Sequence, residues 1–481
     1  MIERKAIVTA RVGIFAVSHG IYNEQFPGLY DNFAKYHGEL VNKIKRCGVE
    51  VVDYGIVDSS EQSFAAAEKM KGDSLDLLVC NMITYATSSV FTPILMNSGL
   101  PIILAALQPR SAMDYTKAST FMQLENDNIC SVPEFMGVAA RMGKKIYDVI
   151  IGTLYNDEKA DGELREWCDI AKVLHSLKGA RMGLMGHTLE AMYDMHSNPT
   201  AIAKAFGVHV PLLEVDQVAE IYKNVDENKV KEKVALIERE FDTPDPGSDP
   251  LATKLTEADK LSAARAAVAL DEFVEKNRLT GLAYYYEGTA GSVNREVVSN
   301  FIVGNSILNA EGIPMCGEYD IKTCIAMLIM DRLGIGGSFA ELHPFDFDSD
   351  IILVGHDGPH HIAIADGRPK LRSLSKYHGK YGSGASVEFK IKSGEITIFG
   401  ITEKADGSFK FVIGEGYSED GPIPPTGNTN TRGRFLPTTK EFVKRWVMEG
   451  PTHHYALGVG HHAETIKKIA DVLGIEAVIV K

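Results

Sequence analysis

Short apolar runs alternate with amphipathic stretches from the start of the chain, and this alternation limits the possible folds more than any other feature. Four runs have the length of buried strands, at residues 12–17, 49–54, 75–80 and 101–106. The stretch 30–47 between the first two runs has the period of a helix with one apolar face. Strands that alternate with helices form βαβ units around a parallel sheet. The sequence therefore predicts a doubly wound α/β domain at residues 1–178.

The same alternation begins again near residue 181 and continues to a helix at 321–333, which predicts a second doubly wound α/β domain at 179–333. From about residue 350, apolar and polar residues alternate singly, and Ser-Gly and Asp-Gly turns separate the runs. This pattern predicts an antiparallel, barrel-like β domain at 334–481. The segment 421–434 has few apolar residues, so we expect a long loop near a functional surface there.

Charge and cysteine usage exclude several classes of protein. The chain carries 50 Lys and Arg against 64 Asp and Glu, a net charge of −14, and has no dense basic run that would neutralise phosphates, so we expect no nucleic-acid partner. Its six cysteines form no CxxC pair, as is typical of reduced thiols. Without a signal-peptide pattern or an apolar run of about 18 residues, we expect a cytoplasmic protein that does not contact membranes.

Histidines concentrate in the predicted β domain, where nine of the 15 lie at or after His343. His356 ends an apolar run and precedes an Asp-Gly turn. Two His pairs, 453–454 and 461–462, enclose a glycine-rich segment, and one member of each pair faces inward if the backbone there is extended. A histidine at a strand end can also do no more than bind a carbonyl, so no single position identifies a site.

Two glutamates lie on short glycine-flanked segments nearby. Glu318 follows Gly317 just before a predicted helix, and Glu341 follows two glycines. Each has an ordinary alternative, since Glu318 could stabilise the helix N-terminus and Glu341 could be a solvated turn residue. Together, however, two Glu and two or more His permit a site of mixed oxygen and nitrogen ligands for a cation such as Mn²⁺. A zinc–thiolate site is not indicated, because no second cysteine pair occurs.

At these residues the chain resembles the L-arabinose isomerase family, within the wider L-fucose/L-arabinose isomerase superfamily. The family motif Gly-Glu-x-Asp-x-Lys-Thr is matched at 317–323, and a Gly-Gly-Ser-Phe-x-Glu segment at 336–341. A strand-end His and a His-His segment follow in the family's order. The resemblance implies one bound Mn²⁺, with Co²⁺ or Mg²⁺ as alternatives. The metal ligands that it implies are Glu318, Glu341, His356 and His454.

Near the N-terminus, the segment 18–22 resembles a family segment that contacts substrate across a subunit boundary. The positions in register are Ser18, Ile21 and Tyr22, and the substituted ones are His19 for Gln and Gly20 for His. The residues to which the resemblance assigns substrate binding are His19, Ile21, Tyr286 and His453. It also implies a homotrimer, or a homohexamer of two trimers, with active sites between subunits.

These features predict a metal-dependent aldose–ketose sugar isomerase of carbohydrate metabolism, such as arabinose catabolism. Glu318 and Glu341 are the predicted catalytic residues, which move protons as the aldose becomes a 2-ketose. One alternative is an isomerase or epimerase of a deoxy, acidic or sulfonated sugar, favoured by His19 and by the further histidines His360, His361, His461 and His462. Another alternative is a non-catalytic sugar-binding regulator whose two α/β lobes act as a clamp.

Overall fold

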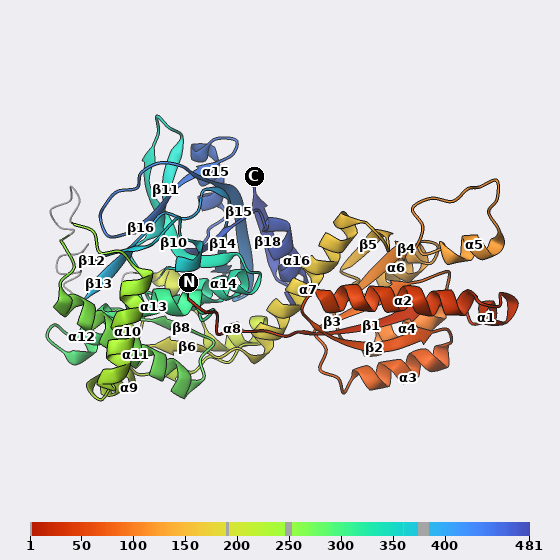
Figure 1. The fold of residues 1–481 in the computed structure, drawn as a ribbon, viewed down its shortest axis with the longest axis horizontal. Coiled ribbons are helices and arrows are strands. Elements are labelled where there is room, and N and C mark those ends of the chain that lie inside the picture. The colour runs from red at the N-terminus through yellow and green to blue at the C-terminus, as the bar shows by residue number, and fades with distance from the viewer. Residues whose placement is uncertain (1, 189–191, 246–252, 359, 374–383) are drawn as a thin grey trace. The chain divides into compact units, whose positions relative to one another are not determined.

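A computed structural model describes residues 2–188, 192–245, 253–358, 360–373 and 384–481 (Figure 1). The chain forms two compact units, Val8–Ser176 and a second unit that combines Met1–Ile7 with Leu177–Lys481. Each unit is described by itself below. The division into three domains at 178/179 and 333/334 stays a prediction. Within the described ranges, no helix has both the length and the apolar composition that crossing a membrane requires.

The unit Val8–Ser176 is built on a five-stranded parallel sheet with the order β2-β1-β3-β4-β5. Its strands are β1 (Arg11–Val17), β2 (Glu50–Val57), β3 (Leu77–Met82), β4 (Ile102–Gln108) and β5 (Asp148–Thr153). Its helices are α1 (Ile21–Gln25), α2 (Leu29–Arg46), α3 (Ser60–Met70), α4 (Ser88–Asn97), α5 (Thr120–Glu125), α6 (Val132–Arg141) and α7 (Glu158–Gly179), the last of which ends beyond the unit boundary.

Helices cover both faces of this sheet, as the continuous apolar run of β1 requires. Phe15 packs in one cluster with residues of α3, α4 and α6. Its neighbour Ala16 points to the opposite face and packs with Leu29 and Phe33 of α2. The prediction of a doubly wound α/β fold is confirmed here.

The second unit begins with a four-stranded parallel sheet of order β7-β6-β8-β9. The strands are β6 (Met182–Met185), β7 (Leu212–Leu213), β8 (Gly281–Tyr284) and β9 (Met315–Cys316). The helices are η1 (Tyr193–Met195), α8 (Pro199–Phe206), α9 (Val215–Lys223), α10 (Glu227–Glu240), α11 (Glu257–Asn277), α12 (Val293–Ser299), α13 (Phe301–Ala310) and α14 (Ile321–Arg332). Helix α14 contacts β8 and also β10, β14 and β17 of the following sheet, and all of its residues are buried.

The last part of the chain forms a seven-stranded sheet of order β14-β17-β10-β11-β16-β15-β18, and a further pairing of β14 with β15 closes it into a barrel-like structure (Figure 1). The strands are β10 (Gly336–Asp346), β11 (Ile351–His356), β14 (Gly394–Glu403), β15 (Phe409–Glu419), β16 (Thr429–Phe435), β17 (Tyr455–Val459) and β18 (Glu476–Val480). A separate pair, β12 (Lys370–Ser373) and β13 (Ala385–Glu388), and the helices η2 (Ile362–Ile364), α15 (Thr439–Met448) and α16 (Ala463–Leu473) complete it. The predicted antiparallel, barrel-like C-terminal part is confirmed.

Strand β16 corrects the prediction of a long loop at 421–434. It occupies residues 429–435, between β11 and β15 in the sheet. Its first residues, Thr429 and Thr431, are buried although they are polar. The Thr429 hydroxyl donates to the Val387 carbonyl at 3.1 Å, and the Thr431 hydroxyl contacts that of Ser418. Internal hydrogen bonds satisfy these side chains, so a central strand forms without the apolar alternation by which the sequence reveals its neighbours.

Glycines let the strands that lead to the candidate site approach their neighbours closely. Gly337 of β10 has a φ of +108°, and a Cβ atom there would lie 2.8 Å from the Met327 carbonyl oxygen of α14. Gly355 of β11 lies against β16, and a Cβ atom there would lie 1.9 Å from the Thr429 carbonyl oxygen. Both positions therefore admit only glycine without a shift of backbone.

We predict that Gly355→Ala destabilises the unit that contains the barrel by about 1–3 kcal/mol, because the added methyl group forces β11 and β16 apart. Urea unfolding measures this change. The matched control is Gly400→Ala in β14, where the nearest atoms to an added Cβ lie 3.7 Å away, an ordinary contact. Equal stability of the two variants would contradict the close approach at Gly355.

Candidate metal centre

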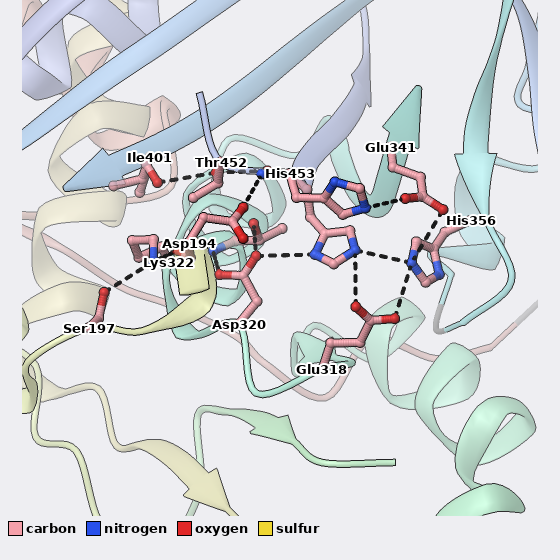
Figure 2. Close-up of polar contacts among 12 residues, drawn as sticks. Asp194, Ser197, Glu318, Asp320, Lys322, Glu341, His356, Ile401, Thr452 and His453 are labelled. Carbon is pink, nitrogen blue, oxygen red and sulfur yellow. Dashed lines mark hydrogen bonds and ion pairs between the residues drawn. The ribbon is translucent and has the colours of Figure 1, made fainter. Parts of the chain in front are cut away.

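Three neighbouring strands of the barrel bring a carboxylate and two imidazoles to one edge. Glu341 lies in β10, His356 is the last residue of β11, and His454 immediately precedes β17. Strand β10 lies between the other two and is antiparallel to both, with Glu341 opposite Gly355 and Ala340 opposite Tyr455. Because antiparallel neighbours present the end of one strand beside the start of the next, this register gathers the three side chains, of which Figure 2 labels Glu341 and His356.

Glu318 reaches the same place from the turn between β9 and α14. Glu318 and Tyr319 have φ angles of +60° and +65°, a left-handed conformation that is uncommon outside glycine. The Tyr319 amide donates to the Tyr284 carbonyl at 2.9 Å, and Asp320 caps α14 by accepting from the Thr323 amide at 3.1 Å. Backbone held in such a conformation by its surroundings occurs preferentially at functional sites. The turn directs the Glu318 carboxylate toward the barrel edge.

The Glu318 carboxylate faces both imidazoles. Its oxygens lie 3.8 Å from Nε2 of His356 and 3.5 Å from Nε2 of His454. The Nε2 atoms of His356 and His454 are 3.2 Å apart, and Glu341 lies 3.8 Å from the His356 Nε2. The carboxylates and the two Nε2 atoms therefore converge on one small region, as Figure 2 shows for the labelled members.

The remaining ring nitrogens also lie beside carboxylates. Nδ1 of His356 is 3.2 Å from Asp357, and Nδ1 of His454 is 3.4 Å from Asp320. A carboxylate at Nδ1 favours the tautomer with the proton on that nitrogen, which leaves a lone pair on Nε2. In another tautomer, one Nε2 atom would instead donate a hydrogen bond to the other, which lies 3.2 Å away. With both Nε2 lone pairs free, the arrangement fits a metal ion.

Phe339 fixes the planes of both imidazoles. Its ring centroid lies 4.4 Å from that of His356 and 4.3 Å from that of His454. Phe339 is fully buried in β10, two residues before Glu341 and on the same face of the strand. The aromatic ring limits the rotation of the two histidines and excludes water from one side of the site.

Glu341 has a second partner, His453, whose Nε2 lies 2.7 Å from the Glu341 Oε2 atom. Burial raises the pKa of the Glu341 carboxyl, but the hydrogen bond from His453 and the neighbouring imidazoles outweigh it, so this pKa lies below the usual glutamate value. The same hydrogen bond raises the pKa of His453. Glu341 is therefore ionised at neutral pH.

In the described part of the chain, two overlapping groups of side chains could hold a metal ion, and they share His454. The first is Glu318, His356 and His454, and the second is Glu341, His453 and His454, with the ligand atoms of each group within 4.8 Å of one another. Carboxylate oxygens with imidazole nitrogens suit borderline divalent cations. All four predicted metal ligands thus lie together, and His453 adjoins them.

Tyr286, a predicted substrate-binding residue, shares a small cavity with two of these side chains. The cavity is lined by Tyr284, Tyr286, Gly317, Glu318, His356, Gly358 and residues of α12 and α13. Burial raises the pKa of the Tyr286 hydroxyl, and the Glu318 carboxylate raises it further. Tyr286 is thus a neutral hydrogen-bond donor at the edge of the site.

His19 and Ile21, the other predicted substrate residues, belong to the unit Val8–Ser176. His19 follows β1, and its ring packs edge-on against Tyr22 and Tyr85 at centroid distances of 5.2 and 6.0 Å. Ile21 begins α1 and is exposed. The strand order reverses between β1 and β3, and open α/β sheets bind ligands beyond the carboxyl ends of strands at such a point. Substrate contact by both residues stays a prediction.

Four further histidines lie apart from the two ligand groups of the described chain. Nε2 of His361 is 3.4 Å from Asp331, and the His461 Nε2 is 3.0 Å from the Gly416 carbonyl. His360 is fully buried with its ring edge-on to Phe389, and the His462 amide donates to Thr397. These contacts join elements within the unit that contains the barrel.

Sequence reasoning assigned no role to Asp320, Asp357 or Phe339. Asp320 and Phe339 lie inside the recognised motifs, so their positions carried a signal, although their contact with an imidazole did not. Asp357 belongs to an Asp-Gly pair that indicates a turn. The contact of Asp320 with His454 joins distant segments and forms only on folding, whereas Asp357 directly follows His356, and only the orientation of that ring was unknown from the sequence.

A family model described as "L-fucose isomerase, C-terminal domain" matches residues 368–481. A protein named sulfoquinovose isomerase from Priestia aryabhattai is 20% identical over 439 residues, which cover 89% of this chain and 91% of the relative. L-arabinose isomerases from Nocardioides sp. and Bacillus subtilis are 24% and 22% identical, each over 72% of this chain and over 68% and 69% of the relative. The similarity thus extends over nearly the whole length of one relative.

We predict that Asp320→Asn lowers the free energy of unfolding by about 1–3 kcal/mol at neutral pH, because it removes a buried charge partner of His454 and Lys322. Burial raises the pKa of the Asp320 carboxyl, but His454 and Lys322 outweigh it and hold this pKa below its usual value. The contribution of Asp320 is thus fully present above about pH 4, the unfolded value, and is lost as the pH falls through the folded one.

Urea unfolding between pH 7 and pH 3 tests this sign. Stability of the wild type should fall more steeply below about pH 4 than that of Asp320→Asn. Asp348→Asn makes the same substitution at an exposed position and serves as the control. If Asp320→Asn and wild type keep a constant difference down to pH 3, Asp320 does not titrate as described.

Proposed function

We propose that this chain is a member of the L-fucose/L-arabinose isomerase superfamily and interconverts an aldose sugar and its 2-ketose with a bound divalent cation, Mn²⁺ in the first instance. Glu318, Glu341, His356 and His454 would hold the cation. The observation that carries this proposal is the pair of buried Nε2 atoms 3.2 Å apart that both face the Glu318 carboxylate. A cation satisfies this arrangement, and Co²⁺ or Mg²⁺ are alternatives to Mn²⁺.

The bound cation supplies positive charge that stabilises the negative charge developing on the two substrate oxygens and makes the C2 hydrogen more acidic. The carboxylates move the protons. One carboxylate removes the proton from C2 and returns it to C1, while the other transfers a proton from O2 to O1. Glu341 suits the role of an acceptor because the low pKa of its carboxyl keeps it ionised. Phe339 packs against the His356 ring and Tyr286 lines a cavity with Glu318, so both would limit the access of water to the site.

A second candidate function is the isomerisation of a sulfonated sugar. It is favoured by the alignment with the relative named sulfoquinovose isomerase from Priestia aryabhattai, which spans 89% of this chain. His19 points in the same direction, because an imidazole can carry positive charge and pair with an anionic group where an amide cannot. A non-catalytic sugar-binding regulator is disfavoured, because binding alone requires no cation between two carboxylates.

We expect the purified protein to convert at least one sugar of a panel of L-arabinose, L-fucose and sulfoquinovose in the presence of Mn²⁺, followed by NMR of aldose and ketose. Exhaustive chelation should abolish the activity, and Mn²⁺ or Co²⁺ should restore it. Metal analysis of the same samples shows whether the loss follows the bound ion. Turnover that persists in protein free of metal would refute the proposed centre, and the preferred sugar decides between the two candidate functions.

Glu318→Gln and Glu341→Gln should each lower kcat by about 100-fold or more, since each removes a proton-transfer group while its size is kept. The assay is performed at saturating metal, so that weaker metal binding does not account for the loss. Glu395→Gln in β14, where the side chain is exposed, is the control for removing one carboxylate from the barrel. Near wild-type turnover in either site variant would remove that residue from the proposed chemistry.

We also propose that the protein forms a homotrimer, or a hexamer of two trimers, with active sites between subunits. Size-exclusion chromatography with light-scattering detection measures the mass of the assembly directly. The role proposed for His19 and Ile21 depends on the assembly, because those residues would complete a neighbour's site.

A further inference from the structure

Asp194 contacts the candidate site from a segment that carried no sequence signal. It lies in the short 3₁₀ turn η1, and its Oδ2 atom accepts a hydrogen bond from the backbone amide of His453 at 2.8 Å (Figure 2). His453 is the residue whose ring lies 2.7 Å from the Glu341 carboxylate. A single residue thus connects η1 to a carboxylate of the site.

The segment around Asp194 is itself fixed by Lys322 of α14. The Lys322 ammonium donates to the Asp194 carbonyl at 2.7 Å, to the His196 carbonyl at 3.3 Å and to the Ser197 hydroxyl at 3.2 Å. These three acceptors use all three protons of the ammonium group. Lys322 is fully buried, and a buried cation without such partners would be strongly unfavourable. The position of Asp194 is therefore coupled to the folding of α14.

The segment that leads to β17 is held on both sides of His453, and the His453 ring packs edge-on against the His454 ring at a centroid distance of 4.7 Å. Thr452 is held by its hydroxyl, which donates to the His454 carbonyl at 2.8 Å and to that of Ile401 at 3.3 Å. His454 is fully buried beside Asp320. His453 lies between them with its side chain 47% exposed. Because solvent reaches this ring, its contact with the His454 ring leaves room for the backbone position of His453 to influence the direction of the imidazole toward Glu341.

We propose that Asp194 is a positioning residue, which holds the His453 backbone so that the His453 imidazole keeps the Glu341 carboxylate in the orientation that proton transfer needs. The inference rests on the proposed function of Glu341 as a proton carrier. One helical turn at the start of α14 then orients both consecutive histidines, His454 directly through Asp320 and His453 indirectly through Lys322 and Asp194.

The test begins with Asp194→Ala, which removes the acceptor, and Asp194→Asn, which keeps an oxygen in the same place. Asp194→Ala should lower kcat about 10-fold with little change in KM, since loss of one hydrogen bond to a charged group leaves Glu341 less often in the reactive orientation. Asp194→Asn should keep most of the wild-type kcat. Tyr193→Ala, in the same turn with an exposed side chain, is the matched control and should resemble the wild type.

A double-mutant cycle with His453→Ala separates positioning from a general structural effect. If Asp194 acts through His453, the double variant Asp194→Ala/His453→Ala should be no slower than His453→Ala alone. If the decreases in kcat of the two single variants multiply in the double variant, the two residues act independently and the proposal is wrong. So would an Asp194→Asn variant as slow as Asp194→Ala, because the acceptor oxygen would then not matter.

A second readout does not depend on catalysis. In full-length protein labelled with ¹⁵N-histidine and freed of metal, the His453 amide is identified by its absence in His453→Ala. Asp194→Ala should speed hydrogen exchange of this amide about 10-fold or more, with Asp194→Asn near the wild type. Unchanged exchange in Asp194→Ala would refute the proposed contact. Failure of the proposed function would instead be seen as full turnover in Glu341→Gln with these exchange rates unaffected.

Discussion

The close approach of two buried imidazoles constrains this part of the structure more than any other interaction. His356 ends β11, His454 immediately precedes β17, and their Nε2 atoms lie 3.2 Å apart. Their outer nitrogens lie beside Asp357 and Asp320, and Phe339 lies against both rings. The carboxylates on the outer side favour a proton on each Nδ1 atom, which turns the two Nε2 lone pairs toward the region that the Glu318 carboxylate also faces.

Helix α14 connects most parts of the site. The turn before it carries Glu318 in a left-handed conformation, its N-cap is Asp320, and its first turn carries Lys322. Its far side packs against β10, β14 and β17 of the barrel. Because every residue of α14 is buried, the helix cannot move without disturbing the parallel sheet and the barrel together. The side chains of the candidate centre are thus positioned by the core of the unit and not by surface loops.

Most of the fold could be predicted from apolar periodicity, because buried strands and amphipathic helices leave that pattern. The predicted helix 30–47 corresponds to α2 (Leu29–Arg46), and the predicted strand 12–17 to β1 (Arg11–Val17). Strand β16 was missed because its inward-facing threonines are satisfied by hydrogen bonds and not by apolar packing. A polar strand in the middle of a sheet has the composition of a loop, so a method based on hydrophobic alternation fails there.

By itself, the sequence determined the order of the elements, the fold class and the residues of the candidate centre, because spaced motifs around Glu318, Glu341, His356 and His454 are local patterns. The tertiary structure decided which atoms of these residues converge, through the strand order β17-β10-β11 and the turn before α14. It also decided the partners Asp320, Asp357 and Asp194, whose carboxylates lie beside the backbone or ring of a histidine. Contact between Asp194 and His453, which are 259 positions apart, leaves no periodic trace in the sequence and exists only once the chain has folded.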